Sequence, residues 1–340
     1  YRDDMFRLEL DDGEVYALKP MNCPNAMVIF GSTRRSYREL PLRLADLSPL
    51  HRFELSGTLN GLFRARAFRQ DDAHIFVAPD QMLDEFGRVL ALVDRVYTLF
   101  GLDYRFRLGS RPDDFMGDIE TWNHAEAILE QVLQDSGRDF WIEHGDGAFY
   151  GPKIDILMRD SLGREWQMGT IQLDFQTPRR FELVYAAEDG SLQAPIVIHR
   201  AIFGSVERFV GILIEHLNGA FPPWLAPVQA TIIPVTDGEV YYAETTADRL
   251  RERGLRVEVD QSSERMQAKI RAAQLQKVPW MLVVGKREVE AGTVSVRPRS
   301  GDDLGAMPID AFLDMAQQGI EAKSLELPQP RNTVGSRGRD

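Results

Sequence analysis

The stretch His51–Val77 combines positive charge, an aromatic ring and polar groups that bind metals. Two segments with strand character flank a loop rich in Ser, Gly and Asn, which predicts a hairpin with a long loop. In the second segment, Leu62–Arg69, apolar and basic residues alternate, so Arg64, Arg66 and Phe68 fall on one strand face. Such a face suits a planar anionic ligand such as a nucleotide, although a solvated edge hairpin has the same pattern.

Three residues able to bind a borderline metal lie in separate segments: Cys23, His74 and His199. One thiolate and two imidazoles fill three of the four positions of tetrahedral zinc, and an open fourth position is typical of functional zinc. The ligands are too far apart in sequence to form a local motif. The competing interpretation is therefore a buried cysteine and two ordinary histidines.

The composition limits the classes of protein to which this chain can belong. The chain has 340 residues, of which 27% are charged and 44% hydrophobic, and this predicts a globular protein with two domains. A net charge of -12 argues against non-specific nucleic-acid binding by the whole surface but allows a local basic patch. The single cysteine excludes an intrachain disulfide framework and favours a reducing, cytoplasmic location. No apolar run reaches the roughly eighteen residues of a membrane span, so no membrane partner is expected.

Secondary-structure signals place the candidate residues on a large sheet covered by helices. Apolar residues three or four apart predict amphipathic helices over Pro79–Phe100 and Ile119–Ser136. A long succession of strands follows, which favours an α+β domain built on one antiparallel sheet.

A proline-rich segment, Phe221–Pro227, marks a domain boundary. Beyond it the pattern becomes β-α-β-α-β, which predicts a small α/β domain with a mostly parallel sheet. The predicted domains are residues 1–224 and 225–326, followed by a disordered tail over 327–340.

Six segments together resemble threonyl-tRNA synthetases, in order and with matching gaps, from about Tyr1 to Leu325. The hairpin resembles motif 2 of class II aminoacyl-tRNA synthetases, and Gly204–Arg208 resembles motif 3. The six segments are Met21–Pro24, Tyr37–Arg43, Gln70–Phe76, Gly147–Lys153, Gly169–Phe175 and His199–Arg208. The resemblance implies a class II antiparallel sheet flanked by helices, followed by an α/β anticodon-binding domain. It also places motif 1 before Tyr1, so we expect the chain to begin inside a larger protein.

The resemblance implies a ligand for most of the candidate residues. Cys23, His74 and His199 would hold one zinc ion per chain. The ATP-binding residues would be Arg52 on the α-phosphate, Glu54 on adenine, Arg64 on phosphate, Phe68 stacked on adenine, and Arg208 on the far phosphates with Mg²⁺. Arg52 and Arg208 would be the catalytic residues. The threonine pocket would contain Gln70, Asp72, Tyr150, Lys153 and Gln172, with Asp72 accepting the hydroxyl proton. Arg271, Glu288 and Arg297 would contact tRNA.

The activity implied is the ATP-dependent joining of L-threonine to tRNA(Thr) in a cytoplasmic homodimer. Zinc would select threonine, because an apolar pocket separates threonine from valine only by roughly a hundredfold or less. Three positions depart from the family pattern: Asn25 and Ala26 replace Gly-His after Cys-Pro, and Ser263 replaces Asn. Two alternatives remain open, namely an inactive synthetase-like protein that binds tRNA or threonine, and another class II synthetase such as the prolyl or seryl enzyme.

Overall fold

The computed structural model describes residues 4–160 and 162–328. The chain divides into two compact units, Tyr1–His216 and Leu217–Asp340, where the sequence predicts a division after Trp224. Most of the predicted disordered tail, from residue 329 onward, lies outside the described residues. None of the helices in the described parts of the chain combines the length and apolar character that a membrane crossing requires.

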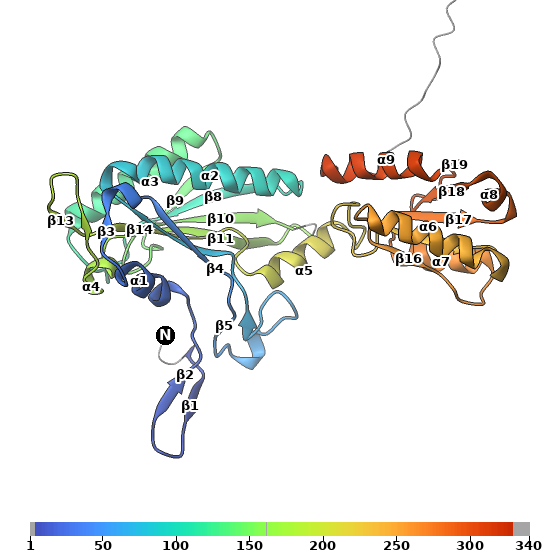
Figure 1. Cartoon of the computed structure of the whole chain (residues 1–340). Helices are drawn as coiled ribbons and strands as arrows, with labels where there is room; N and C mark the ends of the chain where they lie inside the picture. The colour runs from blue at the N-terminus through green and yellow to red at the C-terminus, as the bar shows by residue number, and fades with distance from the viewer. Residues whose placement is uncertain (1–3, 161, 329–340) are drawn as a thin grey trace, which may run out of the picture. The chain divides into compact units, whose positions relative to one another are not determined.

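The first unit is built on a seven-stranded sheet with the strand order β4-β7-β14-β11-β10-β8-β9 (Figure 1). Every neighbouring pair in this sheet is antiparallel except β8 and β9. Two long helices, α2 (Met82–Leu99) and α3 (Ile119–Ser136), lie over one face of the sheet. The strands are β4 (Leu42–Asp46), β7 (Asp72–Val77), β8 (Tyr104–Gly109), β9 (Phe140–Glu143), β10 (Lys153–Arg159), β11 (Glu165–Asp174) and β14 (Ile196–Ala201). The predicted α+β class, with an antiparallel sheet flanked by helices, is confirmed.

The two covering helices follow from their apolar spacing and their end signals. In α2 the buried positions include Phe86, Leu90 and Val93, which pack toward the sheet, whereas Leu83 is exposed although it belongs to the same predicted stripe. The prediction started this helix too early, because Pro79–Gln81 forms a separate 3-10 turn. The bounds of α3 agree with the prediction, since Asp118 caps its first turn and Gly137 ends it with φ 65°.

The predicted hairpin exists, but its strands are short. Strand β5 (Leu50–His51) pairs with β6 (Ala67–Phe68), and the residues between them form a long loop. This loop contains a 3-10 turn over Ser56–Thr58 and a bridge between Asn60 and Arg64. Turn formers therefore override the strand pattern expected over residues 62–66, and Arg64 and Arg66 do not lie on a common strand face with Phe68.

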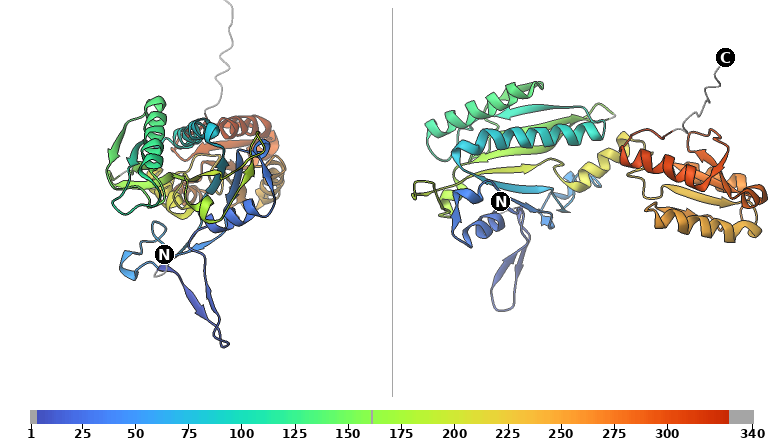
Figure 2. Two further views of the ribbon diagram at one scale, coloured as in Figure 1. Left: turned by 90° about the vertical axis from the view of Figure 1, so that its left-hand side faces the viewer. Right: turned by 45° about the horizontal axis from the view of Figure 1, so that its top comes forward.

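Shorter elements complete the first unit. A two-stranded ribbon of β1 and β2 projects from it, as Figures 1 and 2 show. These elements are β1 (Arg7–Glu9), β2 (Val15–Ala17), α1 (Cys23–Gly31), β3 (Arg35–Ser36), α4 (Thr177–Arg180), β12 (Tyr185–Ala186), β13 (Leu192–Gln193) and α5 (Val206–His216).

The second unit is an α/β domain with a five-stranded mixed sheet, in the order β16-β15-β17-β18-β19. The first three strands in this order are parallel, and the last two are antiparallel additions. Alternate residues of β17 face two cores: Trp280 and Leu282 pack with α6 and α9, and Met281 packs with α7. Its elements are β15 (Ala230–Pro234), α6 (Val240–Glu252), β16 (Val257–Val259), α7 (Met266–Leu275), β17 (Trp280–Val284), α8 (Lys286–Ala291), β18 (Thr293–Pro298), β19 (Ala306–Pro308) and α9 (Ile309–Glu321).

Candidate functional site

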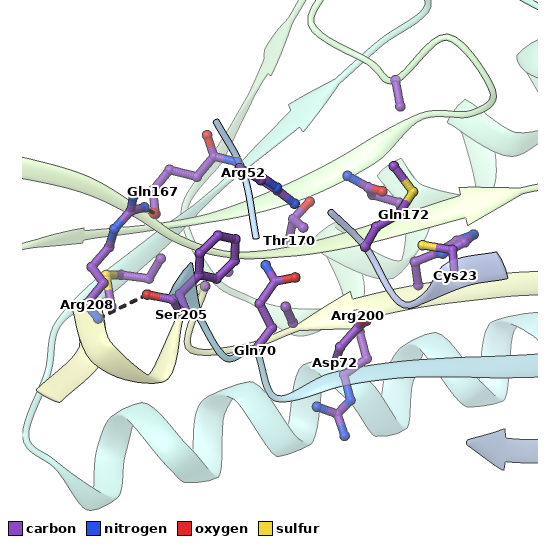
Figure 3. Close-up of a pocket in the computed structure, with 18 of the residues that line it drawn as sticks. Cys23, Arg52, Gln70, Asp72, Gln167, Thr170, Gln172, Arg200, Ser205 and Arg208 are labelled. Carbon is purple, nitrogen blue, oxygen red and sulfur yellow. Dashed lines mark hydrogen bonds between the residues drawn. The ribbon is translucent and has the colours of Figure 1, made fainter. Parts of the chain in front are cut away.

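One cavity of about 620 Å³ in the first unit contains most of the predicted site residues (Figure 3). Its walls come from the start of α1, the hairpin loop, β7, β11, β14 and the turn into α5. The predicted residues in its lining are Cys23, Arg52, Glu54, Arg64, Phe68, Gln70, Asp72, Tyr150, Gln172, His199 and Arg208. The fold therefore brings segments from most of the first unit to one site.

The three candidate metal ligands lie together: Cys23 and His199 line one end of this cavity, whereas its described lining does not include the buried His74. His74 and His199 are directly opposite each other on the antiparallel strands β7 and β14, and Cys23 is the first residue of α1. One ligand atom from each lies within 4.8 Å of the other two. Among the described residues, neither nitrogen of His74 nor Nδ1 of His199 has a hydrogen-bond partner, although both rings are buried. Buried polar atoms normally have partners, so this donor set fits a metal ion.

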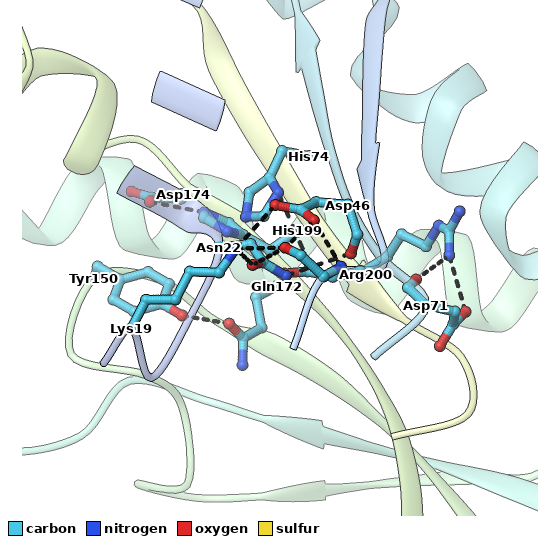
Figure 4. Close-up of polar contacts among 12 residues, drawn as sticks. Lys19, Asn22, Asp46, Asp71, His74, Tyr150, Gln172, Asp174, His199 and Arg200 are labelled. Carbon is cyan, nitrogen blue, oxygen red and sulfur yellow. Dashed lines mark hydrogen bonds and ion pairs between the residues drawn. The ribbon is translucent and has the colours of Figure 1, made fainter. Parts of the chain in front are cut away.

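Asp174 at the end of β11 orients one of these ligands. Its Oδ2 lies 2.9 Å from Nε2 of His199, and its Oδ1 accepts the backbone N–H groups of Gln176 and Thr177 at 2.8 Å (Figure 4). This contact leaves Nδ1 of His199 directed to Cys23 and His74, as in carboxylate–histidine–metal arrangements. The sequence alone assigns no role to Asp174.

The pKa values of the two histidines are shifted in opposite directions. Burial, with the nearby positive charge of His199, lowers the pKa of His74 to about 3. Burial also opposes the charged form of His199, but the hydrogen bond to Asp174 and the interaction with Cys23 together outweigh it, and the pKa of His199 rises to about 10. The same bond holds the pKa of Asp174 below its usual value despite burial. His74 is therefore neutral at pH 7, whereas His199 must lose a proton before it can bind a metal.

The opposite end of the cavity gathers three arginines. Burial lowers the pKa of Arg208, and the positive charges of Arg64 and Arg52 lower it further. Arg208 donates from Nε to the carbonyl of Phe63 at 2.8 Å, and Arg64 pairs with Glu54 at 2.8 Å. Converging guanidinium groups that repel one another are suited to a ligand with several negative charges.

The aromatic ring of Phe68 lies beside this cluster. The guanidinium carbon of Arg52 is 5.2 Å from the centre of the Phe68 ring, and its Nε donates to the carbonyl of Pro20. Arg66, which the hairpin pattern placed on the same face, instead contacts the ring of Phe53 at 5.1 Å and donates to the carbonyl of Glu54. The described lining of the cavity does not include Arg66.

A glycine fixes the position of Arg208. Gly204 has φ 69°, and a β-carbon there would collide with the carbonyl of Met168. The hydroxyl of Ser205 accepts the backbone N–H of Arg208 at 3.0 Å, which secures the first turn of α5. The turn from β14 into α5 thus requires glycine, and it places Arg208 at the cavity wall.

Polar side chains lie between the two ends. The hydroxyl of Tyr150 donates to the amide oxygen of Gln172, and Gln70 and Asp72 lie on the other side of the cavity (Figure 3, Figure 4). Burial raises the pKa of Asp72, and its Oδ2 accepts a hydrogen bond from Asn22 at 3.1 Å. These groups can distinguish a hydroxyl from a methyl group in a small ligand.

Lys153 lies apart from its predicted neighbours. Among the described residues, the cavity lining does not include it. Its ammonium group forms ion pairs with Asp146 at 3.1 Å and with the buried Asp155 at 3.0 Å, both shared with Arg107. In this structure Lys153 therefore compensates a buried carboxylate instead of facing the cavity.

The predicted RNA contacts are spread over three elements of the second unit. Arg271 is exposed on α7. Glu288 accepts the backbone N–H of Gly285 at 2.9 Å and so caps α8. Arg297 on β18 pairs with Asp303 at 2.5 Å. Only Arg271 lacks a local structural contact of this kind among those described.

Comparison with known families agrees with this division of the chain. Residues 6–217 match the tRNA synthetase class II core domain (G, H, P, S and T), and residues 229–319 match the anticodon binding domain. The fold and the site therefore define a class II tRNA synthetase core joined to an anticodon-binding domain.

Individual relatives narrow the family. The chain is 51% identical over 337 residues to threonine–tRNA ligase of Symbiobacterium thermophilum, covering 99% of this chain and 52% of that protein. It is 51% identical over 325 residues to the ligase of Caldanaerobacter subterraneus, covering 96% of this chain and 50% of the relative. The crystal structure of the RNA binding domain of threonyl-tRNA synthetase from Cryptosporidium parvum superimposes with a TM-score of 0.89 at 40% identity, covering 97% of this chain and 81% of that one. The chain belongs to the threonyl-tRNA synthetase family, and it spans about half the length of the two ligases.

Proposed function

We propose that the chain carries threonine–tRNA ligase activity. The carboxylate of L-threonine attacks the α-phosphorus of ATP and pyrophosphate leaves. The terminal adenosine hydroxyl of tRNA(Thr) then takes the threonyl group from the adenylate, and AMP leaves. One observation carries the proposal: a single cavity has a Cys-His-His cluster with two buried histidines at one end and three arginines at the other. The family and its relatives support the same activity.

Cys23, His74 and His199 are proposed to hold one zinc ion. When bound, zinc would supply a Lewis acid able to bind both the amino group and the hydroxyl of threonine. The unpartnered buried nitrogens and the carboxylate of Asp174 behind His199 support this assignment. The thiolate of Cys23 also requires a reducing compartment, which supports a cytoplasmic location.

At the zinc end, the chain's own residues provide the selectivity. Asp72 is proposed to accept the hydroxyl proton of threonine, because its carboxylate lines the cavity close to the metal cluster. Valine has no hydroxyl to offer, so its binding would leave the second oxygen of this buried carboxylate, the one that Asn22 does not contact, without a donor. Gln70, Tyr150 and Gln172 are proposed to complete the pocket around the amino acid.

At the other end, the charged residues are proposed to bind ATP. Arg52 would contact the α-phosphate and Arg208 the far phosphates together with Mg²⁺, so that the negative charge of the transition state is neutralised. Arg64 would contact phosphate, Phe68 would stack on adenine, and Glu54 would recognise its amino group. Binding would exchange the Glu54–Arg64 pair for contacts with the nucleotide.

The second unit is proposed to bind the anticodon of tRNA(Thr). The match to the anticodon binding domain supports this role, and the exposed Arg271 is suited to stacking on an unpaired base. Glu288 and Arg297 remain proposed contacts. The predicted bounds of the domains, residues 1–224 and 225–326, and the homodimer are likewise proposals.

ATP–pyrophosphate exchange tests the proposal. We expect exchange that depends on threonine, with serine accepted less well and valine hardly at all, in protein that contains one zinc per chain. Equilibrium binding of tRNA(Thr) tests the second unit separately. Zinc-loaded protein that binds threonine and ATP but gives no exchange would support the inactive, binding-only alternative. Exchange with proline or serine but not with threonine would contradict the proposed specificity.

A further inference from the structure

Behind the cavity wall, Asn22 uses its side chain in an unusual way. Asn22 is the N-cap residue of α1, a position where asparagine normally accepts a hydrogen bond from the first turn of the helix. Its side chain makes no such bond, although it is 99% buried. Its Nδ2 instead donates to Oδ2 of Asp72 at 3.1 Å and to the carbonyl of Asp46 at 3.4 Å. The Asn22 amide therefore binds the carboxylate of Asp72 and does not cap the helix.

Lys19 determines which way this amide faces. Its ammonium group donates to Oδ1 of Asn22 at 2.7 Å, to Asp46 at 3.3 Å and to the hydroxyl of Ser48 (Figure 4). Exchanging the amide oxygen and nitrogen would place an NH₂ group against an ammonium ion and an oxygen against a carboxylate. Both contacts would be repulsive, so Lys19 makes Asn22 a donor toward Asp72.

Asp46 and Ser48 hold Lys19 in place. Asp46 and Asp72 are opposite each other on β4 and β7, so two carboxylates would face one another without the intervening amide and ammonium. Asp46 accepts the backbone N–H of Ser48 at 2.8 Å and also its hydroxyl. The chain of contacts therefore runs from Ser48 and Asp46 through Lys19 and Asn22 to Asp72.

We infer that Asn22 is a positioning residue for Asp72, and that Lys19 acts through Asn22. By occupying Oδ2, the amide fixes the carboxylate so that its second oxygen remains available to the cavity. The inference rests on the proposed function, because it assigns Asn22 a share in the preference for threonine over valine. Neither residue touches the substrate in this arrangement.

The test compares two amino acids and two readouts. In Asn22→Ala we expect kcat/KM for threonine exchange to fall by about tenfold, the effect of losing one hydrogen bond to a charged group. The value for valine, which has no hydroxyl, should change by less than about twofold, as should KM for ATP, because neither uses the oriented carboxylate. Zinc should remain at one per chain. A purely structural defect would lower threonine and valine together.

Three further variants make the test selective. Lys19→Met should reduce the threonine-to-valine ratio by about threefold to tenfold, because the amide can then turn over, and Lys19→Arg should restore part of it. Asn25→Ala removes an exposed amide from the same helix and should leave the ratio unchanged.

Two results would overturn the inference: an unchanged ratio in both Asn22→Ala and Lys19→Met, or loss of zinc with equal losses for both amino acids. Absence of threonine-dependent exchange in the unmodified chain would instead contradict the proposed function. Equilibrium binding of threonine and valine to the same zinc-loaded variants would then decide the inference.

Discussion

The two ends of the cavity hold their functional groups in different ways. We call the end at Cys23 and His199 the metal end, and the end at Arg52, Arg64 and Arg208 the phosphate end. At the metal end, buried residues position the groups that face the cavity: Asp174, itself in the lining, holds His199, and Asn22 holds Asp72. These supporting groups are themselves buried and hydrogen-bonded. The metal end is therefore arranged before any ligand arrives, apart from nitrogen atoms that still need a partner.

At the phosphate end, the functional groups contact one another or the backbone. Glu54 and Arg64 form an ion pair whose side chains are 20% and 49% exposed, and Arg208 donates to the carbonyl of Phe63. Phe63 and Arg64 lie in the long hairpin loop, which has few strand contacts. A bound nucleotide would replace these contacts. The groups at this end would therefore reach their functional arrangement only when the nucleotide binds.

The difference indicates where the chain is least tolerant of change. A preorganised group cannot be replaced by a neighbour, whereas an exchangeable pair loses only a modest interaction when one partner is removed. Substitutions at the metal end should therefore affect metal content and amino-acid choice. Substitutions at the phosphate end should affect the nucleotide and the rate, with zinc retained.

The largest effect is expected from Cys23→Ala. Removing the thiolate leaves two ligands, and we expect loss of zinc together with a fall in threonine-dependent exchange of about a thousandfold or more. Zinc content and exchange are measured on the same preparation. The exposed Asn25→Ala, two residues away, is the matched control and should keep both. A zinc-free Cys23→Ala protein with normal exchange would remove the metal from the proposed function.

Arg208→Ala is the corresponding test at the phosphate end. If Arg208 contacts the phosphates in the transition state, as proposed, its loss should lower kcat by about a hundredfold to a thousandfold. Zinc content and the threonine-to-valine ratio should not change, because Arg208 is proposed to bind phosphate and not the metal or the amino acid. Arg95→Ala, an exposed arginine on α2, serves as the control. Loss of zinc in Arg208→Ala would show that the two ends are not independent.

Asp174→Asn tests whether the residue that holds His199 contributes to metal binding. The substitution keeps the shape of the side chain but removes the charge behind His199, so we expect zinc to bind about tenfold to a hundredfold more weakly. Titration against a chelator of known affinity measures this change. KM for ATP should stay within about twofold of the starting value, since the phosphate end is unaltered. Unchanged zinc affinity would mean that Asp174 only completes a turn through its contacts with Gln176 and Thr177.

How far the sequence anticipates the structure depends on the range of the interaction. Helix α3 was predictable at both ends because its signals are local, an acidic cap at Asp118 and glycine at position 137. The hairpin strand over Leu62–Arg69 was predicted too long, because the turn residues in the loop outweigh alternating polarity. Leu83 fits the helical period of α2 but is exposed, since the period alone does not fix the width of the buried face.

The candidate site shows the same limit. Strand pairing brings His74 and His199 together, and no spacing in the sequence indicates that pairing; the family resemblance does. The supporting residues Asp174, Asn22 and Lys19 have no signal of their own, because a buried polar side chain looks like any other until its partner is known. Lys153 was assigned to the threonine pocket by resemblance, while the structure pairs it with Asp146 and Asp155.

The smallest effect is expected from Glu54→Gln, which acts on the exchangeable pair itself. An amide keeps the size of the side chain and one hydrogen-bond acceptor, but it removes the ion pair with Arg64. A partly exposed pair contributes about 0.2–1 kcal/mol, so the free energy of unfolding should change by no more than about 1 kcal/mol.

The nucleotide should respond more than the fold in this variant. KM for ATP is expected to rise by about threefold to tenfold, because the variant would lose the proposed contact of Glu54 with adenine. Zinc content and the threonine-to-valine ratio should be unaffected, and Glu165→Gln, which removes a similar exposed pair with Arg105, controls for loss of surface charge. If Glu54→Gln instead destabilised the protein by several kcal/mol, the phosphate end would be as rigidly built as the metal end. The proposed difference between replaceable contacts at the phosphate end and preorganised contacts at the metal end would then be wrong.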